Sequence, residues 1–283
     1  MMRVGAQREQ WSRSRSYEIA VFMSVLTVSL IVAFGSSYLF DHVPTLHIDV
    51  VAGLVVPFAI AFGPIGILAV AIAPIVRGAL VFHFSIESLL ISAAYALSGL
   101  VAYHMAQRVP IRDDRRALRG RRWLAAYAGI ATAAAAVMAA VVGVGSEVLA
   151  LSPFYLAGGL ALQYWLVTLL VGLPLFVLVL VTWPDAVQTT RTSDGDTRFF
   201  LAIIGVALLW LLAGIVGSLG FYTLVRIPPW ALHDVGLGPL VILADPGIFG
   251  RGAVRAQVVL AALAVSLLVG LLRAAGPTSG EST

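Results

Sequence analysis

The chain has 283 residues, of which 60% are hydrophobic and only 11% are charged, and its formal net charge is +4. Soluble domains carry about 25% charged residues, and helices on a soluble surface need polar faces that most segments here lack. The composition therefore excludes an ordinary soluble protein and predicts an integral membrane protein. Cysteine and lysine are both absent, which excludes disulfides, cysteine nucleophiles, thiolate metal sites and a lysine Schiff base.

The first predicted span covers residues 19–40. A polar tail, residues 1–18, precedes it and contains several arginines: Arg3, Arg8, Arg13 and Arg15. Because arginine-rich flanks stay on the cytoplasmic side of a membrane, the N-terminus is expected in the cytoplasm and the following loop outside. The tail is polar over too long a stretch to be a cleavable signal peptide.

The next apolar stretch, residues 49–82, is too long for one helix in a hydrocarbon core of about 30 Å. It is interrupted by Gly63, Pro64 and Gly66, and proline disfavours helix at the residue before it. We expect two short spans, 49–63 and 66–82, joined by a tight turn. A plain hairpin without a binding role and a single kinked, tilted helix are the alternatives.

A span over residues 88–106 is followed by the most basic loop of the chain. Its arginines are Arg108, Arg112, Arg115, Arg116, Arg119, Arg121 and Arg122. Four spans counted from a cytoplasmic N-terminus place this loop in the cytoplasm, as the charge rule requires, whereas three spans would place it outside. The loop suits an anchor against anionic lipid head groups better than a nucleic-acid surface, so no nucleic-acid partner is expected.

Four further spans complete an all-α, polytopic membrane protein of about eight transmembrane helices. They are predicted at residues 124–144, 155–181, 199–224 and 257–272. Pro174 is expected to kink the second of these. Residues 226–255, rich in proline and glycine, are expected to form a re-entrant or surface segment. The single membrane domain, 19–273, then ends in the cytoplasm with a disordered tail, 274–283.

Histidines and carboxylates gather at the predicted outer ends of the spans. The candidate ligand-binding residues among them are Asp49, His47, His83 and Glu87, the last two being one helical turn apart. Such side chains bind a metal, sense pH or hold a cationic ligand when they converge. Alternatively, they are polar only because outer loops meet water. No strict metal-binding spacing is present, so no metal and no cofactor are expected.

Arg77 is the remaining candidate, because it lies inside an apolar run near the outer boundary. An arginine at the bilayer centre costs about 2–3 kcal/mol, and less if it reaches outward to the interface. It is expected either to meet an anionic ligand or to be a structural arginine that reaches the interface or pairs with Asp49 or Glu87. The chain has no nucleophile motif, paired intramembrane aspartates or diphosphate motif, so it is not expected to be an enzyme.

The segment AGLVVPFAIAFGPIGILAVAIAPIVRGALVFHFSIESLLISAAYALSGLVAYHM resembles the prokaryotic membrane-associated sensor domains of the MASE kind. The later Trp165, Gly172 and Pro174 are similar to the W…G…P pattern of that family. The resemblance covers residues 20–273 and implies an eight-span sensor module. Members of the family are usually fused to an output domain, and no such domain is recognised within these 283 residues. LHIDVVAG also replaces the Trp-Pro-rich stretch often found before the second span.

The same segment is also similar to the substrate-binding (S) component of energy-coupling-factor vitamin transporters, through its acidic start and its FGPxxG-like turn. That resemblance implies a compact bundle that docks on a transporter partner. Those proteins usually have six spans, however, and the first span here lacks their small-xxx-small docking motif.

We therefore expect a multi-pass cell-membrane protein that binds a small molecule or senses the outer environment and acts through a separate partner protein. Solute transport, as an S component or another carrier, is the alternative. The lipid bilayer and a signalling or transporter subunit are the expected partners. The positions expected to act as structural hinges are Gly63, Pro64, Gly66 and Pro174.

Overall fold

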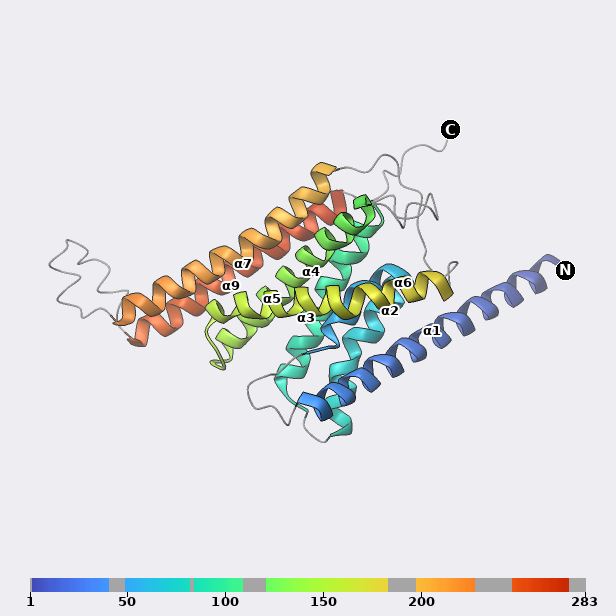
Figure 1. Ribbon diagram of the computed structural model, residues 1–283, viewed down its shortest axis with the longest axis horizontal. Coiled ribbons are helices and arrows are strands. Elements are labelled where there is room, and N and C mark those ends of the chain that lie inside the picture. The colour runs from blue at the N-terminus through green and yellow to red at the C-terminus, as the bar shows by residue number, and fades with distance from the viewer. Residues whose placement is uncertain are drawn as a thin grey trace. The chain divides into compact units, whose positions relative to one another are not determined.

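A computed structural model describes residues 2–40, 49–81, 84–108, 121–182, 197–226 and 246–274. These residues are almost entirely helical, and no strand is found among them (Figure 1). The helices are α1 (Met2–Phe40), α2 (Ala52–Leu80), α3 (Ile86–Ala106), α4 (Arg121–Val148), the short η2 (Phe154–Leu156), α5 (Ala157–Val167), the π-helix η3 (Thr168–Gly172), α6 (Leu173–Thr182), α7 (Thr197–Arg226) and α9 (Pro246–Ala274). The all-α prediction is confirmed for this part of the chain.

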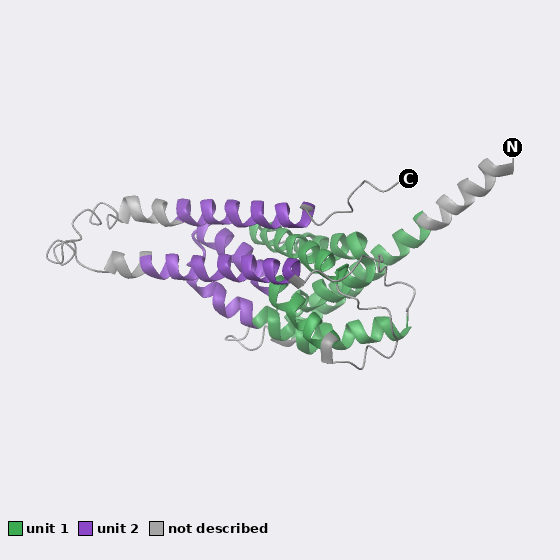
Figure 2. Cartoon of the chain, turned by 90° about the horizontal axis from the view of Figure 1, so that it is seen from above, with its two compact units in different colours: residues 1–134, 163–195 green, residues 135–162, 196–283 purple. Residues whose placement is uncertain are grey.

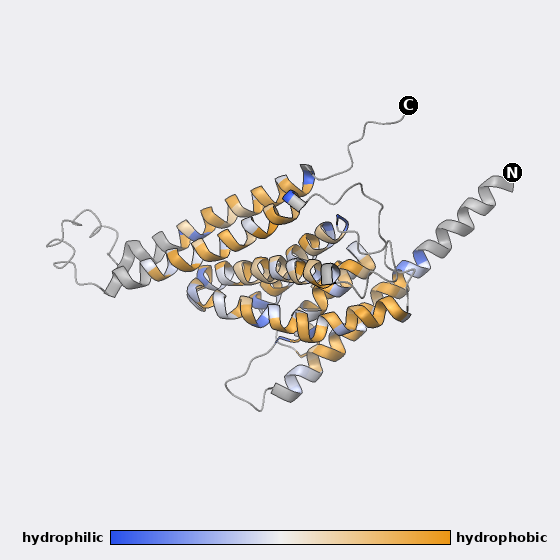
Figure 3. Cartoon of the chain, turned by 45° about the horizontal axis from the view of Figure 1, so that its top comes forward, coloured by the Kyte–Doolittle hydropathy of each residue, from blue (hydrophilic) through white to orange (hydrophobic). Residues whose placement is uncertain are grey.

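Within the described residues, seven helical stretches are long and apolar enough to cross a membrane. They are Arg15–Tyr38, Ala52–Leu80, Ile86–Ala106, Trp123–Val148, Phe154–Thr182, Arg198–Gly220 and Val254–Arg273. Figure 3 shows hydrophobic residues along most of the length of these helices, as a surface facing lipid requires. The chain is a multi-pass membrane protein by this measure. The sequence predicts eight spans because residues 49–82 divide into two. The count of seven takes the same region, α2, as one helix.

The predicted segment 226–255 is described only at its two ends. Residues 246–255 form the first turns of α9, and Arg226 ends α7. Residues 227–245, and with them most of the predicted re-entrant region, lie outside the described residues. The same holds for the predicted C-terminal tail from residue 275 onward.

Helix α2 is broken in the middle at Gly63, whose backbone has φ 61° and ψ −141°. A side chain rarely adopts this conformation, whereas glycine does so at little cost. A Cβ added to Gly66 would lie 2.3 Å from the carbonyl oxygen of Phe58. In a straight helix these two residues would be about 12 Å apart along the axis. The chain therefore turns back at Gly63, where the Gly-Pro pattern predicts a break.

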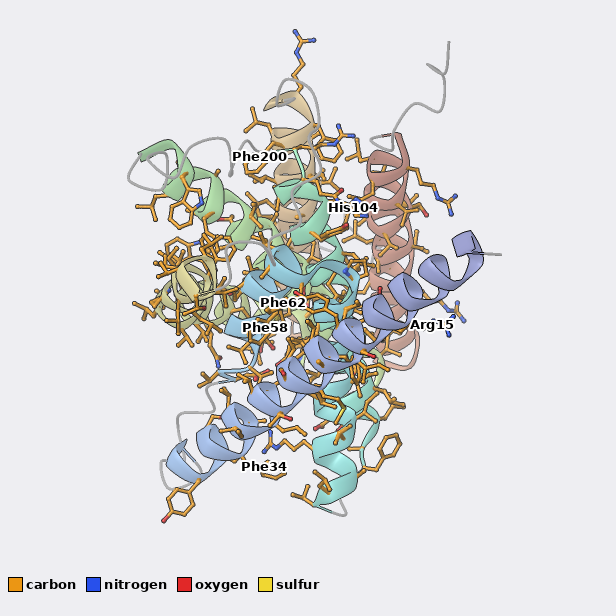
Figure 4. All side chains as sticks on the ribbon, turned by 90° about the vertical axis from the view of Figure 1, so that its right-hand side faces the viewer. Arg15, Phe34, Phe58, Phe62, His104 and Phe200 are labelled. Atoms are coloured by element: carbon orange, nitrogen blue, oxygen red, sulfur yellow. The ribbon has the colours of Figure 1, made fainter. Side chains whose placement is uncertain are left out.

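The second half of α2 packs antiparallel to α3. Ile67 lies against Gly99, 3.1 Å from the position of an added Cβ, and the Ser92 hydroxyl donates to the Ala71 carbonyl at 2.5 Å. Gly63 itself lies beside the ring of Tyr103, near the end of α3. In Figure 4, Phe58 and Phe62 mark the first half of α2, and His104 marks the end of α3.

The chain divides into two compact units, coloured separately in Figure 2. Unit 1 comprises Met1–Ala134 and Gln163–Gly195, and unit 2 comprises Ala135–Leu162 and Asp196–Thr283. In unit 1, the rings of Trp123 and Tyr127 both stack on Phe176, with ring centroids 6.0 and 5.6 Å away. Stacked pairs of this kind add to the stability gained from burying their area, so they fix α4 against α6.

In unit 2, helix α7 packs against α9 and η2. The ring of Phe154 fills the space beside Gly214, where an added Cβ would lie 2.3 Å from the ring. The Gln257 amide donates to the Gly214 carbonyl at 2.9 Å. Small residues at such contacts let helix backbones approach closely, which is the usual mode of helix packing in membranes.

Candidate functional site

The clearest polar contact inside unit 1 joins Asp49 to Tyr95. Asp49 lies three residues before α2, and the Tyr95 hydroxyl, from the middle of α3, donates to its carboxylate. Tyr95 is buried, and Asp49 is partly buried. The backbone N–H groups of Ala52 and Val51, at the start of α2, also favour the charged form of the carboxylate by donating to it. Burial raises the pKa of the Asp49 carboxyl above its ordinary value, and the Tyr95 hydroxyl and the N–H groups at the start of α2 oppose this rise without cancelling it.

Arg77 lies near the other end of α2, in the half that follows the reversal. Its guanidinium donates to the hydroxyl of Ser37 on α1. Its charge acts on both Asp49 and Tyr95, so the reversal at Gly63 brings the two candidate residues of opposite charge into one electrostatic cluster. The described part of the chain gives Arg77 no carboxylate at ion-pair distance. A guanidinium has five N–H donors, and within the described part of the chain only Ser37 accepts from them.

Tyr164, on α5, adds a fourth member, because its hydroxyl interacts electrostatically with Asp49. Tyr164 is 5% exposed. We call Asp49, Arg77, Tyr95 and Tyr164 the Asp49 cluster. Each member comes from a different segment of unit 1, so the cluster exists only when that unit is folded.

The π-helix η3 lies beside the start of α2. The Gly53 carbonyl oxygen would be 2.3 Å from a Cβ at Gly172. On the other side of this contact, a Cβ at Gly53 would meet the backbone oxygen of Val167 at 2.8 Å. Two glycines therefore allow backbone-to-backbone contact next to the segment that carries Asp49. Such π-segments occur often at functional sites.

Pro174 gives a physical reason for the π-helix. A proline has no N–H, and its ring clashes with the carbonyl four residues earlier, here that of Leu170. Widening the preceding turn relieves this clash, and η3 ends two residues before Pro174. The sequence predicts a disturbance here, and the structure has a π-helix in an otherwise continuous stretch from Phe154 to Thr182.

Of the remaining predicted ligand-binding residues, the structure describes only Glu87, which does not join this cluster. Glu87 is exposed in the first turn of α3, next to the Ser85 cap of that helix. His47 and His83 lie outside the described residues. Among the residues that are described, no group of three or more histidine or carboxylate side chains is placed to hold a metal ion.

Tyr95, Tyr164 and Ser37 were not predicted as site residues from the sequence. A tyrosine in an apolar helix is usually a core residue with its hydroxyl on a nearby acceptor. One signal was present: Tyr95 follows Ser92 by three residues on the same face of α3. Ser92 donates to the Ala71 carbonyl and Tyr95 to Asp49, so this spacing marks the face of α3 that packs against α2 without selecting Tyr95 as a site residue.

Comparisons with known proteins add no relative. No family model, curated protein or solved structure matches this chain.

Proposed function

We propose that this protein is a small-molecule-binding membrane module, sensor-like in its action, whose ligand is a small carboxylate or phosphate anion held at Arg77. The observation that carries the proposal is the Arg77 guanidinium inside the Asp49 cluster, to which the described residues bond only the Ser37 hydroxyl. Ionisable residues at membrane depth are expensive and are usually functional. Guanidinium groups bind carboxylates and phosphates through paired N–H donors.

The roles of the other cluster members follow from their charge. The Asp49 carboxylate limits the net positive charge around Arg77, and Tyr95 fixes that carboxylate through its hydroxyl. A ligand that carries both an anionic and a donor group would satisfy Arg77 and Asp49 together. The sensor acts through a separate signalling subunit, to which occupancy of the cluster is transmitted by α2 and α3.

The proposed topology places both termini in the cytoplasm and counts the two halves of α2 as two crossings, giving eight. The reversal at Gly63 supports this count, because it returns the segment after α3 to the side from which α1 starts. The arginines of residues 108–122 then lie on the cytoplasmic side of the cell membrane, facing anionic lipid head groups.

Thermal unfolding of the purified chain tests the ligand. The probes are acetate, succinate, citrate and phosphate, added at a constant sodium concentration. At least one anion is expected to raise the Tm of the wild type saturably, by about 3 °C or more, because a ligand stabilises the state that binds it. Arg77→Gln is expected to remove the effect, and the exposed Arg273→Gln is its matched control. Equal Tm shifts in the wild type and Arg77→Gln, or no shift with any anion, contradict the proposal.

Transport is the second candidate function. It is favoured by the broken α2, since short, interrupted helices around a charged cluster are typical of carriers. Vesicles containing only this chain separate the two functions. Binding without accumulation of the labelled anion supports the sensor, whereas accumulation that depends on Arg77 supports a carrier.

A further inference from the structure

Unit 2 contains a second polar cluster, which the Asp49 cluster does not involve. Its members are Glu147 on α4, Ser218 on α7 and Gln257 on α9, which are 6%, 0% and 2% exposed. Each has a buried oxygen without a hydrogen-bond partner among the described residues: Oε1 of Glu147, Oγ of Ser218 and Oε1 of Gln257. Buried polar atoms are almost always paired, so three unpaired oxygens in one unit call for a ligand.

Two contacts hold the Glu147 carboxylate in position. Its Oε2 accepts from the Phe154 backbone N–H at 3.1 Å. The Ser218 hydroxyl lies beside the carboxylate without reaching the geometry of a hydrogen bond. The first carboxylate oxygen is therefore fixed, while the second has no hydrogen-bond partner in the part of the chain that the structure describes.

Gln257 reaches the same face of α7 from α9. Its Nε2 donates to the Gly214 carbonyl at 2.9 Å and lies 3.9 Å from where a Cβ on Gly217 would be. Ser218 follows Gly214 by one helical turn, so it lies on that face too. A flipped amide would turn Oε1 toward the Gly214 carbonyl, where two acceptors repel. The unpaired Oε1 of Gln257 is thus directed away from Gly214.

The chemistry of the three oxygens selects the class of ligand. One carboxylate, one hydroxyl and one amide oxygen are the hard donors that alkali and alkaline-earth cations prefer. Together they carry one negative charge, which a monovalent cation neutralises in a setting where an unpaired charge is costly. We propose that Glu147, Ser218 and Gln257 bind a sodium ion. The site lies in unit 2, so the sodium proposal does not depend on whether an anion binds at Arg77.

Thermal unfolding of the full chain in detergent, at about pH 8 so that exposed carboxylates are ionised, tests the site. Sodium chloride is compared with choline chloride at equal ionic strength. Sodium is expected to raise the Tm of the wild type saturably, by about 3 °C or more at high occupancy. Glu147→Gln is expected to abolish this dependence, and the exposed Glu87→Gln is the control that retains it.

Ser218→Ala is the second variant, in case Glu147→Gln does not fold. It removes one neutral donor and is expected to raise the sodium concentration needed for half of the Tm shift about tenfold. An identical Tm of the wild type in sodium and choline overturns the proposal. So does a Tm that responds to pH but not to sodium, because the carboxyl group then holds a proton. Stabilisation by magnesium or calcium in place of sodium also overturns it, as does an unchanged sodium response in both variants.

Discussion

At the scale of single residues, the contact between Asp49 and Tyr95 is where the fold and the proposed site depend on each other. The carboxylate lies just before α2 but meets the middle of α3, so its charge is met by the Tyr95 hydroxyl and the helix start instead of bulk water. A buried acceptor that loses its donor costs more than the bond itself contributes. The Tyr95 hydroxyl is therefore expected to matter for stability as well as for binding.

Tyr95→Phe removes that hydroxyl and leaves the ring in place. We expect it to lower the free energy of unfolding by about 1–3 kcal/mol, the range for an unsatisfied buried partner. Unfolding in mixed micelles titrated with SDS measures this quantity. The exposed Tyr17→Phe is the control and should change the free energy by less than about 0.5 kcal/mol.

A double variant separates this contact from a general loss of packing. Because Asp49→Asn and Tyr95→Phe remove the same interaction, their combined effect is expected to be smaller than the sum of the two. Strict additivity of the two free-energy changes would mean that the hydrogen bond contributes nothing measurable.

At this scale, some residues of the candidate site were predicted from the sequence and others were not, and the difference has a physical reason. Asp49 and Arg77 stand out in the sequence because charges are rare in apolar runs, and the structure places both in the cluster. Glu87 also stood out, yet its first-turn position leaves it exposed. Tyr95 and Tyr164 could not be selected, since only the reversal of α2 and the packing of α5 decide which tyrosines face the carboxylate.

At the scale of elements, α2 depends on glycine at two positions that serve different needs. Gly63 adopts a positive φ, and Gly66 leaves room for the Phe58 carbonyl as the chain turns back. The break itself was predictable, because proline and glycine disfavour a continuous helix locally. The π-helix was not, because proline alone does not determine whether a helix kinks, ends or widens.

Gly66→Ala is expected to be strongly destabilising, since its Cβ would lie 2.3 Å from a backbone oxygen that cannot move without opening the turn. We expect a loss of about 2 kcal/mol or more, the range for overpacking. Gly35→Ala on α1 is the matched control, because a Cβ there meets nothing within 4 Å. Similar unfolding curves for the two variants would show that the turn at Gly63 is loose enough to accept a side chain.

At the scale of the whole molecule, composition is sufficient to predict a multi-pass, all-α membrane protein. The seven apolar stretches of the described residues agree with the predicted spans to within a few residues at most ends. Helix α9 itself begins earlier than its apolar stretch, at Pro246, so it takes in residues 246–255 of the predicted re-entrant or surface segment. Proline at the first helical position is favourable, so Pro246 suits the start of this helix.

The reversal at Gly63 links the site and the topology. It places Arg77 where its charge acts on Asp49, and in the proposed topology it returns the basic segment after α3 to the side of the N-terminus. If α2 were one straight crossing, both consequences would be lost together. The side of the membrane on which that segment lies therefore tests the central claim most directly.

The absence of cysteine from the chain makes this measurement clean, because a single introduced cysteine has no background. Ala117→Cys in the basic segment and the exposed Leu151→Cys after α4 are treated, in intact cells, with a maleimide that cannot cross the membrane. We predict that Leu151→Cys is labelled at once and that Ala117→Cys is labelled only after the cells are opened. Labelling of Ala117→Cys in intact cells, with Leu151→Cys protected, would contradict the reversal of α2 across the membrane.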